Sequence, residues 1–222
     1  MIINKYFTMK IQELKITKLA RDHAEPWLEV FEHYGWKILG TGREAYVALN
    51  PRKNYVIKIW RRGSNYNKYV DFVKKHPNPH FPRFFREPRR IPGTNFYYIA
   101  LEKLEPVGSQ GSQGNRLVKD FLPEMIYMGL AFSDQGRYFS QLLDVNRELA
   151  SRFPTISYRL ESIAMNPELH EMVYKTIGYP PESWKKAIEQ IMEFADSWQL
   201  EFDLPDFNFM RWHSTLVITD PF

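Results

Sequence analysis

The 222-residue sequence predicts an α+β protein with an antiparallel sheet in its N-terminal half and helices in its C-terminal half. Between residues 36 and 106, short β-branched and aromatic runs alternate with Gly, Asn and Pro turn signals. Beyond residue 107, apolar residues recur at helical spacing in several segments. With 44% hydrophobic and 16% aromatic residues, the chain is rich enough in apolar side chains to fold around a sizeable core.

Four runs in the N-terminal half predict strands, in the order KILGTG, AYVALN, YVIKIW and FYYIALEKL. Between the third and the fourth, NYNKYVDFVKK places Tyr66, Tyr69, Val70 and Val73 at helical spacing. The proline-rich HPNPHFP ends this helix, because proline breaks the helical hydrogen-bond ladder. Ahead of the sheet, PWLEVFEHYGW predicts a short amphipathic helix.

The stretch GSQGSQG, residues 108–114, has nothing to bury and predicts a flexible linker. We expect a hinge near residues 101–107 and two parts, 1–106 and 107–222. Helices are predicted in LVKDFLPEMIYMGL, YFSQLLDVNRELASRF, LHEMVYKTIG and SWKKAIEQIMEFADSWQL. The last follows two prolines, with Ser183 as the expected cap. Its expected apolar stripe consists of Ala187, Ile188, Ile191, Met192, Ala195 and Trp198.

The composition excludes several classes of protein. The absence of cysteine excludes disulfides and thiolate metal sites. The sequence contains no run of about 18 apolar residues, so it predicts no transmembrane helix. The first residues, MIINKYFTMK, do not have the pattern of a signal peptide, so we expect a cytoplasmic protein. The six histidines include His76 and His80 in a proline-rich turn, which does not place them as a helical metal pair.

The net charge of +4 is mild and does not indicate a nucleic-acid partner. The densest basic stretch, RFFREPRR, contains Arg83, Arg86, Arg89 and Arg90. We interpret it as a solvated hairpin face in which the aromatic pair, Phe84 and Phe85, is buried. Contact with phosphate groups is the alternative.

Two fragments in the first half have the residue types of a phosphate site. LGTGREAYV places Gly40, Gly42, Ala45 and Val47 in a Gly-x-Gly-x-x-small-x-Val frame between two strands. Glycines allow the backbone to approach a phosphate closely. Sixteen residues after the second glycine, Lys58 lies in the strand YVIKI. Each of these signals is weak when taken alone.

Two fragments in the second half offer hard oxygen ligands. FDLPDFN contains Asp203 and Asn208 with four residues between them, and Asp220 follows twelve residues after the asparagine in ITDPF. Carboxylate and amide oxygens suit a magnesium ion, with a further carboxylate beside it as a base. The four fragments in this order are far more specific than any one of them.

In this order the fragments resemble those of the protein-kinase family. GTGREAYV resembles its Gly-rich loop, VIK its ATP-anchoring lysine, DLPDFN its catalytic loop and DPF its metal motif, while LEKLEP resembles its hinge. The resemblance covers residues 36–106 and 183–222. Within it, the pattern FDL...N.M...ITDP is similar, more narrowly, to small Ser/Thr protein kinases encoded by bacteriophages. It implies a kinase-like bilobal fold whose N-lobe, within residues 1–106, binds ATP with magnesium as cofactor.

The resemblance also implies a role for each matching residue. ATP would be contacted by the Gly-rich loop, by the strand lysine and by backbone groups of the hinge, at Gly40, Gly42, Ala45, Val47, Lys58, Glu102 and Leu104. Asn208 and Asp220 would hold magnesium, and Asp203 would be the catalytic base. Lys58 would also act in catalysis by holding the phosphates that are not transferred.

The departures from the family pattern have consequences of their own. Ala45 replaces the third glycine, and Glu201 and Phe202 replace the usual His-Arg before the catalytic aspartate. The helix after the strand lysine offers Asp71 where the family has a glutamate. The family continues after its metal aspartate with a substrate-binding segment, which this sequence lacks. We therefore expect an atypical C-lobe in which the helices of residues 107–182 replace that mass.

Three functions are compatible with these residues. The first is an ATP-dependent Ser/Thr protein kinase that phosphorylates host proteins or itself in the bacterial cytoplasm, with no membrane partner. The second is a pseudokinase that binds and inhibits a host partner, which the lacking segment favours. The third is a kinase of small molecules with the same fold. Retention of Lys58, Asp203, Asn208 and Asp220 together favours an enzyme, because a binding module does not need all four.

Overall fold

The computed structural model describes residues 31, 35–41, 45–91, 94–107, 113–134, 142–152, 163, 165–202, 204 and 208–222. The chain forms two compact units. The first unit comprises residues 1–74 and 83–103, and the second comprises residues 75–82 and 104–222. Among the described residues, no helix is both long and apolar enough to cross a membrane.

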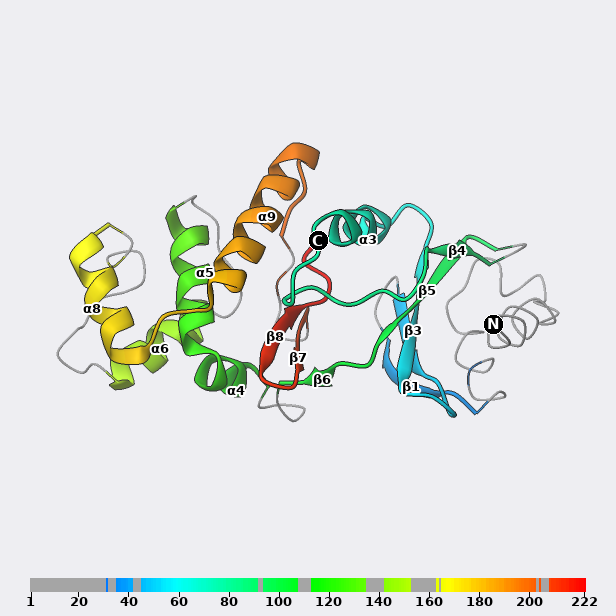
Figure 1. The fold of residues 1–222 in the computed structure, drawn as a ribbon, viewed down its shortest axis with the longest axis horizontal. Helices are drawn as coiled ribbons and strands as arrows, with labels where there is room; N and C mark the ends of the chain where they lie inside the picture. The colour runs from blue at the N-terminus through cyan, green and yellow to red at the C-terminus, as the bar shows by residue number, and fades with distance from the viewer. Residues whose placement is uncertain are drawn as a thin grey trace. The chain divides into compact units, whose positions relative to one another are not determined.

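The first unit is built on a five-stranded antiparallel sheet (Figure 1). Its strands are β1 (Lys37–Thr41), β2 (Ala45–Leu49), β3 (Tyr55–Arg61), β4 (Arg89–Arg90) and β5 (Phe96–Glu102), in the spatial order β1-β2-β3-β5-β4. Helix α3 (Tyr66–Lys75) follows the third strand. The predicted α+β fold class is confirmed, as is the predicted position of the helix after three strands.

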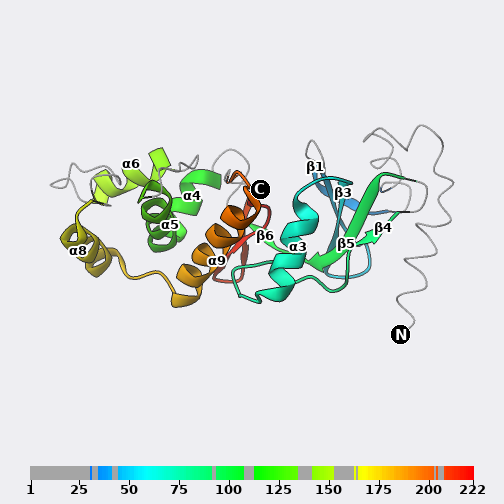
Figure 2. The same ribbon diagram turned by 90° about the horizontal axis from the view of Figure 1, so that it is seen from above.

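Both faces of this sheet are covered, because the middle five residues of β3 are all buried. One face carries an apolar cluster that includes Ile57, Ile59 and Tyr98. The other face carries Trp60, whose ring lies 5.0 Å from the ring of Tyr66 on α3. Since successive strand residues point to opposite faces, Lys58 shares this second face with Trp60. Figure 2 shows α3 lying alongside the sheet.

The second unit contains the helices α4 (Gln113–Asp120), α5 (Leu122–Asp134), α6 (Leu142–Arg152), α8 (Pro167–Ile177) and α9 (Glu182–Trp198). The predicted helix LVKDFLPEMIYMGL is in fact two helices, α4 and α5, which are separated at Phe121. Pro123 explains the break, because proline is accepted in the first turn of a helix but not in its interior. The backbone of α4 begins inside the predicted linker, of which residues 108–112 lie outside the described part.

Helix α9 buries the predicted stripe from Ala187 to Ala195 and also Trp184, whereas Trp198 is exposed. The expected cap is wrong. Pro181 occupies the N-cap position without a side-chain capping bond, and Ser183 lies within the first turn. The Ser183 hydroxyl instead lies 3.0 Å from the Nε2 atom of His80.

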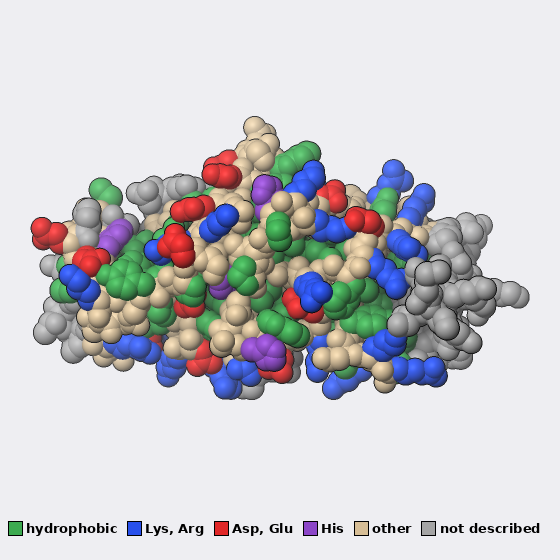
Figure 3. Space-filling view, in the orientation of Figure 1, with side chains coloured by type: hydrophobic (Ala, Val, Ile, Leu, Met, Phe, Trp, Pro, Cys, Tyr) green, Lys and Arg blue, Asp and Glu red, His purple; other side chains and the backbone are tan. Residues whose placement is uncertain are grey.

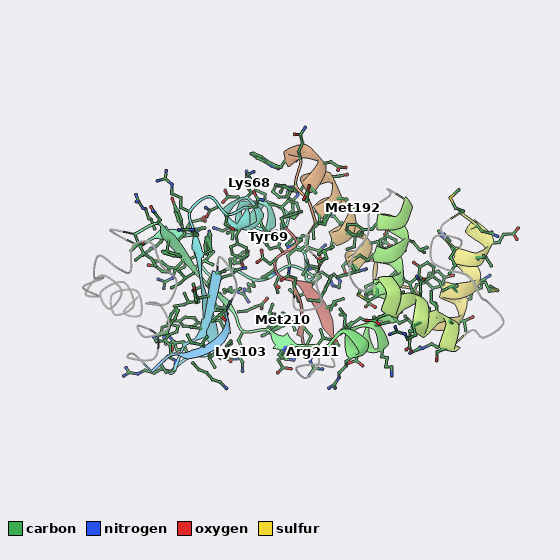
Figure 4. The ribbon with its side chains drawn as sticks, turned by 180° about the vertical axis from the view of Figure 1, so that it is seen from behind. Lys68, Tyr69, Lys103, Met192, Met210 and Arg211 are labelled. Carbon is green, nitrogen blue, oxygen red and sulfur yellow. The ribbon has the colours of Figure 1, made fainter. Side chains whose placement is uncertain are left out.

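A second antiparallel sheet belongs to the second unit (Figure 1). Its strands are β6 (Glu105–Pro106), β7 (Phe209–Trp212) and β8 (Thr215–Ile218), in that spatial order. The turn between β7 and β8 contains His213 with a positive φ of 54°. Figure 4 labels Met210 and Arg211 on β7, and Arg211 forms an ion pair with Glu105 on β6 at 3.2 Å.

Candidate functional site

Three residues predicted to contact a nucleotide form one row across the first sheet. Gly40 on β1 is the register partner of Val47 on β2, and Val47 is the partner of Lys58 on β3. An irregularity in β1 between residues 38 and 40 sets this pairing. Because directly opposed strand residues share a face, Val47 and Lys58 are neighbours on the side that α3 covers. Positions eleven residues apart in the sequence thus lie next to each other.

Gly40 has no structural reason to be a glycine. Its φ is not in the left-handed region, and a Cβ atom added there would meet no atom within 4 Å. The space beside the β1 backbone at this position is therefore open. Of the other predicted loop residues, Ala45 begins β2, whereas Gly42 lies outside the described residues.

Lys58 is buried, with 7% of its surface exposed. Its Nζ atom lies 3.5 Å from the centroid of the Tyr66 ring. Burial of an ammonium group is costly, and the negative face of an aromatic ring offsets part of that cost. Asp71 lies on the exposed side of α3. Helix α3 therefore presents an aromatic ring to the lysine.

Glu102 is hydrogen-bonded to Arg83, which lies in the segment that leads to β4. Its backbone N–H donates to the Arg83 carbonyl at 3.1 Å, and its Oε1 atom accepts from the Arg83 N–H at 2.9 Å. Burial raises the pKa of the Glu102 carboxyl, and the bonds and charge of Arg83 oppose this shift. The Glu102 N–H is therefore occupied by a bond within the first unit, and Leu104, the other predicted hinge residue, is buried. Lys103, labelled in Figure 4, ends the first unit.

The two predicted magnesium ligands lie at one end of the β7–β8 hairpin. Asn208 directly precedes β7, and its carbonyl accepts from both the backbone N–H and the hydroxyl of Thr219, at 2.8 and 2.9 Å. Asp220 is the next residue. The hairpin therefore converts a sequence separation of twelve residues into proximity. Asn208 is 7% exposed, and Asp220 is half-buried.

This pair of residues fits a magnesium ion that is shared with a nucleotide. Mg²⁺ is usually held by one or two carboxylates together with substrate phosphates and water. An amide oxygen and one carboxylate match that description. Within the described ranges there is no group of three or more His, Cys, Asp or Glu side chains that could hold a metal without such help. The predicted base, Asp203, lies outside those ranges.

The basic stretch differs from its interpretation as a face with two buried aromatics. Phe84 is half-buried, but Phe85 is 47% exposed, so the expectation was wrong for the second ring. The Arg83 guanidinium lies 5.9 Å from the Phe85 ring centroid. Beside this ring is a pocket of about 230 Å³, lined in part by Tyr55, Arg86 and Arg89. Figure 3 shows several Lys and Arg side chains on the visible face of the first unit.

Comparison with known proteins gives a likeness at the level of structure. No protein-family model matches the chain, and no curated protein matches it. Among the solved structures, it is similar to the streptomycin–ATP–APH(2″)-IIa ternary complex, with 12% identity and a TM-score of 0.34 over 89% of this chain and 69% of that chain. The function is therefore inferred from the residues of this chain.

Proposed function

We propose that this protein is an ATP- and magnesium-dependent phosphotransferase with a protein-kinase-like fold. The observation that carries the proposal is the formation of two local groups from widely spaced positions. In the first unit, Gly40, Val47 and Lys58 share one cross-strand row. In the second unit, Asn208 and Asp220 share one end of a hairpin. Phosphoryl transfer requires both kinds of group, one for the nucleotide and one for the metal.

The proposed chemistry depends on positioning and on neutralisation of charge. The β1 backbone at Gly40 covers the phosphates, Val47 contacts the adenine, and Lys58 binds the phosphates that are not transferred. Asn208 and Asp220 hold the magnesium ion, which supplies positive charge to the phosphate oxygens when it is bound. The acceptor hydroxyl attacks the γ-phosphorus while the bond to the ADP oxygen breaks, and Asp203 takes the hydroxyl proton.

Within this class, we propose a Ser/Thr protein kinase of the bacteriophage type that acts on host proteins or on itself. The sequence pattern of the segments around Asp203 and Asp220 supports this narrower proposal. An N-lobe that ends at residue 106 and a C-lobe from residue 107 remain our proposed domains.

A pseudokinase that binds a nucleotide or a host partner is the second candidate. Glu201 and Phe202 stand where an active kinase has His-Arg before its catalytic aspartate. A protein that only binds a nucleotide, or a host partner, does not need those two residues.

The decisive experiment measures transfer of label from γ-labelled ATP with magnesium, using the protein alone and with bacterial lysate. Asp203→Asn should reduce transfer by about 100-fold or more, since a positioned base contributes at least that much. Asp206→Asn, in the same loop, is the matched control and should retain transfer. Label on a small molecule would point to a small-molecule kinase. Absence of transfer, together with no stabilisation by Mg-ATP, would favour the pseudokinase.

A further inference from the structure

His80 is a buried residue to which the proposed chemistry assigns no role. Only 3% of its surface is exposed. It lies in the segment from Lys75, the last residue of α3, to Pro82, and this segment belongs to the second unit. Its ring packs edge-on against Trp184 of α9, with 5.1 Å between the ring centroids.

Both ring nitrogens of His80 have protein partners. The Nδ1 atom lies 2.7 Å from the Leu216 carbonyl oxygen, and Nε2 lies 3.0 Å from the Ser183 hydroxyl. A carbonyl oxygen can only accept, so Nδ1 carries the proton and donates to it. In the neutral ring, Nε2 then accepts from the Ser183 hydroxyl. The imidazole thus joins β8 to the first turn of α9.

The backbone of His80 makes a second bond to the same strand. The Ile218 N–H donates to the His80 carbonyl at 2.9 Å. Since Thr219 donates its N–H towards β7, the alternate residues Leu216 and Ile218 direct their backbone groups to the opposite side of β8. This side is the outer edge of the β6-β7-β8 sheet. His80 therefore occupies the edge of β8 where a further strand would otherwise pair.

Asn78 fixes the turn that presents His80. Its Oδ1 atom accepts from the His80 N–H, and its Nδ2 atom donates to the Ser183 carbonyl, both at 2.9 Å. Two side chains of one short segment thus bind Ser183. The position of His80 is determined by several bonds and by the packing of Trp184, so it forms a rigid support for β8.

We infer that His80 is a positioning residue for the magnesium site, an inference that rests on the proposed function. It bonds β8 at Leu216 and Ile218, and Asp220 follows two residues later. Metal ligands must be held within about 0.5 Å of their productive geometry by groups that are themselves fixed. Asn208 is bonded to the same end of the hairpin through Thr219. The support from His80 therefore sets the position of Asp220 relative to Asn208.

The test compares His80→Phe with His80→Asn in the full chain. Phenylalanine keeps the ring beside Trp184 but makes neither hydrogen bond, whereas the asparagine amide can still donate to the Leu216 carbonyl. His76→Phe, at an exposed position of the same segment, is the control. Three quantities are measured: Mn²⁺ affinity in the presence of a non-hydrolysable ATP analogue, affinity for the analogue without metal, and amide hydrogen exchange of residues 215–222 without ligand.

We expect His80→Phe to lower the Mn²⁺ affinity by about tenfold or more, which is typical for loss of a group that orients a metal ligand. Metal-free affinity for the analogue should not change, exchange of residues 215–222 should accelerate, and His80→Asn should recover most of the Mn²⁺ affinity. His76→Phe should resemble the wild type in all three measurements.

Unchanged Mn²⁺ affinity in folded His80→Phe would overturn the inference and leave His80 with a purely structural role. If His80→Phe does not fold, Ser183→Ala replaces it, since this change removes only the hydroxyl partner. Ser183→Ala should then lower Mn²⁺ affinity, and no decrease would again overturn the inference. Absence of Mn²⁺ binding to the wild-type protein would contradict the proposed function itself, and the inference would fall with it.

Discussion

Lys58 is buried against the Tyr66 ring, a contact that the sequence did not predict. The negative face of the ring attracts the ammonium group, and the contact limits the positions that the Lys58 side chain can adopt.

Loss of the ring should weaken nucleotide binding. Tyr66→Leu removes a cation–π contact of about 1 kcal/mol, so ATP affinity should fall roughly fivefold. Tyr66→Phe keeps the ring and should retain wild-type affinity. Isothermal titration calorimetry with both variants measures the difference, and equal affinity in the two would show that the ring does not position Lys58.

Gly40 and Gly63 should respond in opposite ways to alanine. Gly40→Ala introduces no clash and no strained φ, so the free energy of unfolding should be retained while ATP affinity falls. Gly63→Ala places a side chain at a φ of +96° and should cost about 1 kcal/mol or more of stability. Urea unfolding and ATP titration of both variants provide the test. Unchanged ATP binding in Gly40→Ala would argue against a phosphate at β1.

Glu124 should make the stability of the second unit depend on pH. Burial raises the pKa of its carboxyl above 4.5, so the folded protein favours the protonated form. The resulting stabilisation is fully present below the unfolded pKa and is lost as pH rises through the folded pKa. The side chain in Glu124→Gln stays neutral at every pH. The urea midpoint of the variant minus that of the wild type should therefore increase from pH 4 to pH 7. Glu193→Gln, at an exposed position of α9, should show no such increase.

At the scale of elements, α9 is attached to α5 through Trp184. This side chain is fully buried, and its indole N–H donates to the Glu124 carbonyl at 2.9 Å. Because α9 also carries Ser183, the partner of His80, its position affects the β8 strand.

Trp184→Phe should lower the free energy of unfolding by about 1–3 kcal/mol, through the lost volume and the lost hydrogen bond. Trp198→Phe, at the exposed end of the same helix, should change it by less than about 0.5 kcal/mol. Chemical denaturation of the two variants measures the contrast. A similar cost at both positions would mean that α9 is not anchored at its first turn.

Elements with a long and clear periodicity were predictable, and short ones were not. The strands β2, β3 and β5 and the helices α3 and α9 each have several apolar residues at the right spacing. Strand β7 has only four residues and β6 only two, so neither produces a pattern that can be separated from a loop. The contacts of His80 were not predictable either, since its partners Ser183 and Leu216 are 103 and 136 residues away in the sequence.

At the scale of the whole molecule, ligand binding should increase the free energy of unfolding. A ligand that binds only the folded state at 100 times its Kd adds about 2.7 kcal/mol to the free energy of unfolding. Mg-ATP should therefore raise the melting temperature more than ATP alone. Asp220→Asn should remove the contribution of magnesium but keep that of ATP, and Lys58→Met should weaken both. A wild-type protein that gains nothing from Mg-ATP would contradict the proposed site.

The candidate site was predictable as an ordered set and not as a geometry. The order of the Gly frame, the strand lysine, the Asp-Asn pair and Asp220 could be recognised in the sequence. The sequence did not reveal that Tyr66 lies against Lys58, or that Thr219 bonds Asn208, because these contacts depend on how the side chains pack.

The assignment of residues 75–82 to the second unit has a consequence for dividing the protein. The chain passes from the first unit to the second after Lys74, returns at Arg83, and passes over again at Leu104. A gene split after residue 103 would therefore give a C-terminal fragment whose β8 edge is bare. The N-terminal fragment would carry the missing piece, including His80. Neither fragment should be fully folded alone, whereas the two produced together should reassemble by fragment complementation.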